Sequence, residues 1–185
     1  MDREFLLHYF SRKPNSIGCE VGVWQGEFSK ILYERLQPHL LHLIDPWIVR
    51  PDYQGREYSA VTSSQAQLDE NYRHVTEHFK GDRVRVIRDL FHNCVLKANQ
   101  PGHRLCLDWI YIDGDRTECY QDLTDCLKIV EPGGYITGGG FDFRDPNSDQ
   151  PLVQEAIERF IDKHTDHARL ITIKNHQYVF QVKIF

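Results

Sequence analysis

The chain has 185 residues, of which 41% are hydrophobic and 26% charged, a composition typical of a globular protein and not of a disordered one. A chain of this length is expected to form a single domain over residues 1–185, with a core that needs no disulfide or metal support. The 22 basic and 27 acidic side chains give a net charge of −5, which argues against nucleic acid as the main partner. The apolar runs are too short to span a bilayer, so no membrane partner is expected.

The cysteines and the first residues of the chain bear on the cellular compartment. Five cysteines occur, an odd number, and none forms a C-x-x-C pair, so free thiols in a reducing environment are expected. The first residues include acids at positions 2 and 4 and lack the continuous apolar segment of a secretion signal. We therefore expect a cytoplasmic protein.

Short apolar runs alternate along the chain with segments in which apolar residues recur at helical spacing. Strands are predicted at residues 16–23, 40–44, 83–88, 107–112, 135–137, 169–173 and 178–184. Helices are predicted at residues 27–36, 63–80, 91–98, 117–130 and 151–164. Thr117 is the expected amino-terminal cap of the fourth helix. Residues 46–62 show no clear period and are expected to form a lid loop.

Strands that alternate with helices predict an α/β fold. The expected architecture is a doubly wound, mostly parallel seven-stranded sheet with helices on both faces. The last two strands flank the residues K-N-H-Q and predict a C-terminal antiparallel hairpin. Ligands of such sheets bind beyond the carboxyl ends of the strands, so the residues that end each strand are the first candidates for a site.

Carboxylates stand at or near the ends of four predicted strands. They are Glu20, Asp45, Asp89 and Asp113. Gly22 and Gly26 end the first strand in a turn at a spacing of four, which allows the backbone to turn sharply and a ligand to lie against it. An acidic rim of this kind suits a cationic, ribose-bearing ligand better than a pyrophosphate.

Four motifs in this order resemble class I S-adenosylmethionine-dependent methyltransferases. They are E-V-G-x-x-x-G at 20–26, Asp45 at the end of the second strand, D-x-I-Y-I-D-G at 108–114, and Pro-Gly-Gly at 132–134. Asp-Pro-Trp after the second strand and Asp-Gly-Asp after the fourth are similar to small bacterial members. The resemblance extends over about residues 16–185 and implies a Rossmann-like methyltransferase fold whose hairpin supplies the antiparallel seventh strand.

The resemblance also implies a set of residues that bind the cofactor S-adenosylmethionine. These positions are Glu20, Gly22, Val23, Trp24, Gly26, Asp45, Pro46, Trp47, Asp89 and Asp113. The glycine-rich loop would hold the amino-acid moiety, and Asp45 would bind both ribose hydroxyls, with Pro46 and Trp47 beside the adenine. Asp89 would contact the adenine, and Asp113 would lie near the reacting methyl group.

Two places depart from the family pattern. Arg116 stands where many relatives have histidine, and Gly138–Gly140 fills the place where some relatives carry ligands for a divalent metal. A metal held by Asp113, Asp115 and Asp142 is conceivable but not favoured, so no metal site is expected. Asp113 or Asp142 could take the proton of the acceptor, and Arg116 could hold an anionic substrate. These three residues are the candidate catalytic residues.

The leading hypothesis is an S-adenosylmethionine-dependent methyltransferase that acts on a hydroxyl or amine of a small-molecule substrate. A homodimer remains open, because a partner subunit could complete the acceptor pocket. One alternative is a catalytically silent protein that kept the cofactor pocket, which a test of turnover would distinguish. An NAD-dependent oxidoreductase is disfavoured, because Gly18, Gly22 and Gly26 do not form G-x-G-x-x-G. A nucleotide-sugar binder could use the D-x-D at 113–115, but the glycine-rich loop would then have no role.

Overall fold

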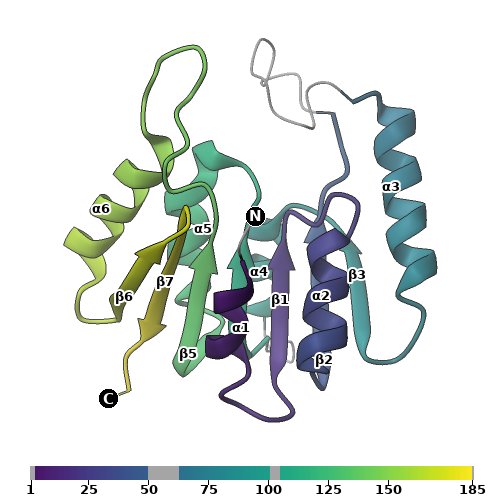
Figure 1. Ribbon diagram of the computed structural model, residues 1–185, viewed down its shortest axis with the longest axis horizontal. Helices are drawn as coiled ribbons and strands as arrows, with labels where there is room; N and C mark the ends of the chain where they lie inside the picture. Colours follow the sequence, from purple (N-terminus) through teal and green to yellow (C-terminus); the bar gives the residue numbers. More distant parts are fainter. Residues whose placement is uncertain (1–2, 50–62, 101–104, 185) are drawn as a thin grey trace.

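The computed structural model describes residues 3–49, 63–100 and 105–184, and a seven-stranded sheet runs through them (Figure 1). The strands are β1 (Ile17–Val21), β2 (Leu40–Asp45), β3 (Val84–Arg88), β4 (Leu107–Ile112), β5 (Val130–Gly138), β6 (Ala168–Lys174) and β7 (Gln177–Val182). Their order across the sheet is β3-β2-β1-β4-β5-β7-β6. Strands β1 to β5 pair in parallel, while β7 is antiparallel to both of its neighbours. The predicted mostly parallel sheet with a terminal antiparallel hairpin is confirmed.

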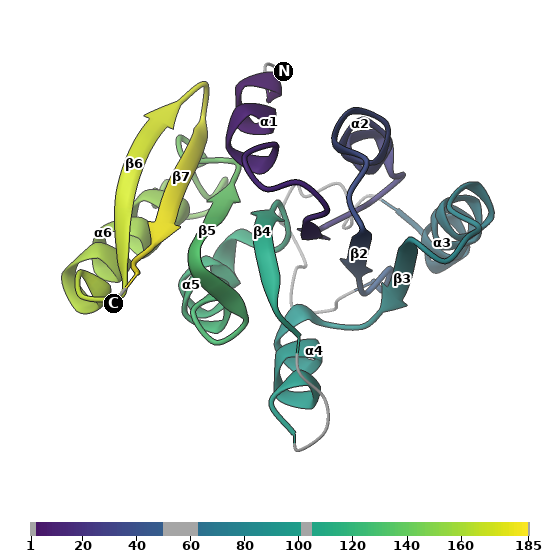
Figure 2. The same cartoon turned by 90° about the horizontal axis from the view of Figure 1, so that it is seen from below.

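Helices cover both faces of the sheet. They are α1 (Glu4–Phe10), α2 (Glu27–Leu36), α3 (Gln65–His78), α4 (Phe91–Ala98), α5 (Cys119–Cys126) and α6 (Leu152–His164). Figure 2 shows α1, α2 and α3 on one face and α4, α5 and α6 on the other. This arrangement confirms the doubly wound fold class. None of the helices in the described part of the chain is long and apolar enough to cross a membrane.

Strand β4 shows why the molecule has two cores. Trp109 and Tyr111 belong to the cluster under α1 to α3, whereas Ile110 and Ile112 belong to the cluster under α4 to α6. Successive side chains of a strand point to opposite faces, so a central strand covered on both sides is apolar throughout. The sequence of β4, L-D-W-I-Y-I, follows this rule and places the strand in the middle of the sheet.

The amino-terminal helix α1 is absent from the elements predicted above. Its residues Leu6 and Phe10 are buried, and the Phe10 ring stacks on Trp109 with 4.5 Å between ring centroids. Any side chain at Gly18 would collide with the Trp109 indole, so this glycine is needed for the packing. The helix runs so that the amino terminus lies toward the carboxyl ends of the strands (Figure 1). This direction brings Arg3 to the candidate site.

Three predicted boundaries are wrong: the start of the fourth helix, its end, which lies at Cys126 and not at residue 130, and the start of the fifth strand. The fourth helix begins with a 3-10 turn at Arg116–Glu118, and the capping side chain is that of Asp115, which accepts from the Thr117 N–H at 2.9 Å. The fifth strand starts at Val130 and includes the Pro-Gly-Gly segment, with a shift in its register against β4. A bulge at the start of a strand accommodates such residues, which the sequence pattern assigned to a loop. Within the expected lid at 46–62, residues 50–62 lie outside the described residues.

Candidate functional site

Strands β2 and β3 lie on one side of β1, and β4 and β5 lie on the other side. The position between the carboxyl ends of β1 and β4 is therefore the topological switch point of the sheet. Backbone hydrogen bonds continue past the strand ends, with Gly22 N–H donating to the Ile44 carbonyl at 2.9 Å and Asp113 N–H to the Val21 carbonyl at 2.8 Å. The expected residues on β1, β2 and β4 are thereby brought to one edge. Ligands of open α/β sheets bind at this position.

The glycine-rich loop after β1 has a backbone that its residue types explain. Gly22 has φ +84°, and a Cβ there would lie 2.7 Å from the Gly114 amide nitrogen and closer still to the Asp113 carbonyl. Gly26 precedes α2 and is also left-handed. Between them, Val23 is buried and Trp24 is half-buried with φ 56°. The loop therefore turns tightly against the end of β4.

Glu20 is a buried carboxylic acid beneath this loop. Its side chain accepts a hydrogen bond from the Ser29 hydroxyl of α2. Burial raises the pKa of Glu20 to about 8; the Ser29 hydrogen bond opposes this, and the nearby Asp113 carboxylate adds to it. Glu20 consequently keeps its proton at neutral pH and reduces the negative charge of the rim.

Replacing Glu20 with glutamine should flatten the pH dependence of stability. Between an unfolded pKa of 4.5 and a folded pKa of about 8, the folded chain keeps a proton that the unfolded chain loses, so stability falls as pH rises. One pH unit corresponds to about 1.4 kcal/mol, so Glu20 accounts for a loss of about 4 kcal/mol from pH 5 to 8. Thermal unfolding of both proteins across this range measures the difference. Glu27→Gln, at an exposed acid, is the control and should keep the pH dependence of the parent. Equal slopes of stability against pH for Glu20→Gln and the parent would contradict the raised pKa of Glu20.

Asp45, the last residue of β2, forms hydrogen bonds with the glycine-rich loop after β1 and with the segment that follows β2. Its carboxylate accepts from the Trp24 N–H at 3.0 Å and from the Trp47 N–H at 2.7 Å. Burial raises the pKa of Asp45, and these backbone N–H groups oppose the rise. The acid thus stands at the strand end, beside the glycine-rich loop.

The side chain of Trp47, close to Asp45 in the chain, is buried. The Trp47 side chain is 1% exposed, packs against Tyr72, and donates from Nε1 to the Trp24 carbonyl at 2.8 Å. The Pro46 carbonyl accepts from the Arg88 guanidinium at 3.4 Å. Trp47 therefore supports the loop from the interior and offers no exposed ring face.

Asp113 directly follows β4 and pairs with two arginines. Arg116 donates to one carboxylate oxygen and also to the Gly114 carbonyl at 2.9 Å. The other oxygen lies 2.8 Å from Nη2 of Arg3 and 3.3 Å from the Tyr111 hydroxyl. Arg116 braces the turn after β4 through these bonds. Arg3 belongs to no motif, and reasoning from the sequence missed it.

Asp142 and Asp89 are paired with side chains other than those that hold Asp113. Asp142 is exposed and pairs with Nδ1 of His176 at 2.5 Å. His176 is in the β6–β7 turn with φ 61°, and its carbonyl accepts from the Phe141 N–H. Asp89 follows β3, where Lys97 lowers its pKa and Asn93 donates to it. Reasoning from the sequence missed His176, although an antiparallel β7 places the hairpin turn at the same edge as the end of β5.

The glycine run after β5 is explained by packing. A Cβ at Gly138 would lie 2.6 Å from the Ile112 carbonyl oxygen, and one at Gly139 would lie 2.9 Å from the Tyr111 hydroxyl. Gly140 has φ +75°, and a Cβ there would lie 2.7 Å from Nε of Arg116. The space that a metal-binding side chain would need is filled by these neighbours.

The donor set does not fit a divalent metal. Asp113 is held by two guanidinium groups, Asp115 caps the 3-10 turn, and Asp142 is paired with His176. Within the described ranges, no group of three His, Cys, Asp or Glu side chains is arranged to hold an ion. The three carboxylates weighed for a metal therefore do not converge.

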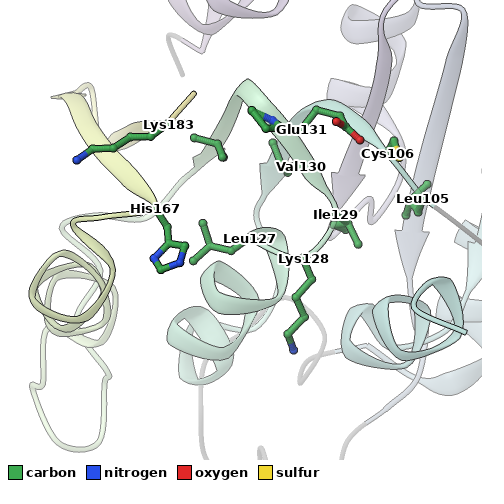
Figure 3. Close-up of a pocket in the computed structure, with 11 residues that line it drawn as sticks. Leu105, Cys106, Leu127, Lys128, Ile129, Val130, Glu131, His167 and Lys183 are labelled. Carbon is green, nitrogen blue, oxygen red and sulfur yellow. The ribbon is translucent and has the colours of Figure 1, made fainter. Parts of the chain in front are cut away.

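A cavity of about 260 Å³ lies at the opposite end of the sheet (Figure 3). It is lined from the beginnings of β4 and β5 and the end of β7, by residues such as Leu105, Val130 and Lys183. None of the candidate residues lines it. The cavity is therefore separate from the switch point.

The sequence matches a family model described as a methyltransferase domain over residues 19–139, about two thirds of the chain. The chain therefore belongs to this methyltransferase-domain family. The resemblance to class I methyltransferases and the expectation of a methyltransferase enzyme are confirmed. No curated protein sequence matches the chain.

Solved structures share the fold at low sequence identity. The O-methyltransferase TomG from Streptomyces achromogenes, in complex with S-adenosylmethionine, is 18% identical with a TM-score of 0.64, covering 97% of this chain and 78% of that one. An O-methyltransferase from Bacillus cereus in complex with S-adenosylhomocysteine is 19% identical with a TM-score of 0.65, covering 98% and 80%. The methyltransferase PaMTH1 from Podospora anserina, bound to S-adenosylhomocysteine, is 14% identical with a TM-score of 0.62, covering 98% and 77%.

Proposed function

We propose that the chain transfers the methyl group of S-adenosylmethionine to a small molecule, with a hydroxyl group as the acceptor. The observation that carries the proposal is the gathering of Glu20, Asp45 and Asp113 around one glycine-rich loop, at the switch point of a methyltransferase-family sheet. The names of the Streptomyces and Bacillus proteins favour a hydroxyl over an amine.

The residues at this edge suit the chemistry of the cofactor. Asp45 is held by two backbone N–H groups and still has lone pairs that can accept from the two ribose hydroxyls. Asp113 offers negative charge to an ammonium or sulfonium group, and the loop from Gly22 to Gly26 allows close approach of the backbone. Asp89 stands at the end of β3, where the adenine would lie. When bound, S-adenosylmethionine supplies an electrophilic methyl group.

The acceptor hydroxyl must lose a proton as its oxygen forms the new bond to carbon and the carbon–sulfur bond breaks. We assign this proton to Nε2 of His176. Asp142 accepts from Nδ1 at 2.5 Å, which orients the ring so that Nε2 is the nitrogen left to take the proton. Asp142 thereby acts through His176, and Arg116 keeps Asp113 in place. No metal ion takes part in this scheme.

Calorimetric titration tests the proposal. The purified chain is titrated with S-adenosylmethionine, S-adenosylhomocysteine, NADH and UDP-glucose, each with and without Mg²⁺. Micromolar binding of the first two ligands, unchanged by Mg²⁺, is the expected result. A folded chain that binds neither of them, or that prefers NADH or UDP-glucose, would overturn the proposal.

Turnover separates an enzyme from a silent binding protein on the same fold. Release of S-adenosylhomocysteine is followed with a panel of phenols, sugars and hydroxy acids as acceptors. Methylation of a hydroxylated compound supports the proposed reaction. Binding of the cofactor without any turnover would favour the silent alternative.

A further inference from the structure

The guanidinium of Arg3 lies between α2 and β4, although the residue precedes α1. Its central carbon is 5.2 Å from the ring centroid of Phe28 and 5.2 Å from that of Tyr111. Nη2 is 2.8 Å from Oδ2 of Asp113, and the side chain is only 20% exposed. Cations over aromatic faces in partly desolvated places are held more firmly than on an open surface. The position of this charge is therefore well defined.

The position follows from the docking of α1. Leu6 and Phe10 are buried, and the Leu6 N–H donates to the Arg3 carbonyl at 3.0 Å at the start of the helix. Phe10 stacks on Trp109 in the middle of the sheet. Arg3 is consequently presented by a packed helix at the carboxyl edge.

Arg3 and Asp113 together offer one positive and one negative charge 2.8 Å apart, next to the glycine-rich loop. An α-amino acid carries an ammonium and a carboxylate on the same carbon, so it presents the complementary pair of charges. A guanidinium has five N–H donors and can contact a second carboxylate while it keeps the first. The Arg3–Asp113 pair therefore matches the amino-acid end of a ligand.

We propose that Arg3 binds the α-carboxylate of the methionine or homocysteine moiety of the cofactor, while Asp113 faces the α-ammonium. This inference rests on the proposed function and makes Arg3 a positioning residue for the cofactor. The charges around Arg3 allow a carboxylate to bind there. Arg116 also pairs with Asp113, and burial keeps Glu20 protonated. A carboxylate can thus approach Arg3 without facing an excess of negative charge.

The test compares two ligands that differ in the amino-acid end. S-adenosylhomocysteine has it, whereas 5′-methylthioadenosine keeps the nucleoside and thioether but lacks the ammonium and carboxylate. For Arg3→Ala, calorimetry is expected to show at least a tenfold loss of affinity for S-adenosylhomocysteine and less than a twofold change for 5′-methylthioadenosine. Arg3→Lys, which keeps the charge but not the fork, should lose part of that affinity.

Arg12 supplies a matched control just beyond the other end of α1. Its guanidinium stacks on Tyr9 and donates to the Tyr135 hydroxyl at 3.0 Å, at the other end of α1. Arg12→Ala should therefore leave the affinities for both ligands unchanged. Thermal unfolding of each variant confirms that the chain is folded at the temperature of titration.

The outcomes separate the two proposals. If the parent chain binds S-adenosylhomocysteine and Arg3→Ala binds it equally well or more tightly, the assignment of Arg3 is overturned while the proposed function stands. An equal loss of both ligands would show that Arg3 only shapes the fold, and would also overturn the assignment. If the parent chain binds neither ligand, the proposed function fails and the assignment fails with it.

Discussion

Replacing Asp45 with alanine is expected to weaken the binding of S-adenosylhomocysteine at least 100-fold. The carboxylate would accept from two ribose hydroxyls, and hydrogen bonds to a charged group are worth about 1.5–3 kcal/mol each. Asp45 also accepts from the Trp24 and Trp47 N–H groups, so its loss loosens the glycine-rich loop that contacts the ligand. Both effects act in the same direction on affinity.

Calorimetry with S-adenosylhomocysteine measures this loss, at a temperature well below the unfolding of the variant. Two backbone N–H groups would be left without their acceptor, so a stability loss of about 1–3 kcal/mol accompanies the change. Asp82→Ala, at an exposed acid before β3, is the control and should bind normally. Affinity of Asp45→Ala within threefold of the parent would show that the ribose is bound elsewhere.

The strands that carry the site could be predicted because their signals are local. Residues 40–45 and 107–112 are apolar runs that end at Asp-Pro and Asp-Gly, so both the elements and their ends are visible in the sequence. The sequence pattern does not predict helix α1, because the helix has only seven residues. Its aromatic side chains are held by contacts with the rings of Trp109 and Tyr135, which lie far away in the sequence. Short helices depend on tertiary packing more than on their own sequence.

The partners of the site residues could not be predicted for the same reason. The motif identifies Asp113, but the pairing with Arg3 joins residues that are far apart in the sequence and follows from the docking of α1. The pairing of Asp142 with His176 likewise depends on which edge the terminal hairpin reaches. Trp47 was expected beside an adenine, yet the φ of 42° at this residue and the contact with Tyr72 place its ring inside the molecule. A sequence pattern reports which residue types follow a strand, and packing decides where their side chains point.

Replacing Gly22 with alanine is expected to destabilise the fold by about 2–5 kcal/mol. The left-handed φ of +84° costs about 1–2 kcal/mol for a residue with a side chain. The added Cβ would meet the backbone at Asp113 and Gly114, which cannot rotate away as a side chain can, and overpacking of this kind costs about 1–3 kcal/mol. The strain would fall between the ends of β1 and β4, so cofactor binding should weaken together with stability.

Gly114 lies directly opposite and serves as the control for Gly22. Its φ lies outside the left-handed region, and a Cβ there would meet only Cγ1 of Val21, at an ordinary 3.6 Å. Urea unfolding of Gly114→Ala should therefore lie within about 1 kcal/mol of the parent, since a compatible alanine also reduces the freedom of the unfolded chain. Equal losses for the two variants would mean that the whole turn tolerates no side chain. A loss of stability in Gly22→Ala alone would show that the chain needs a glycine at position 22, where the end of β1 approaches the end of β4 at the switch point.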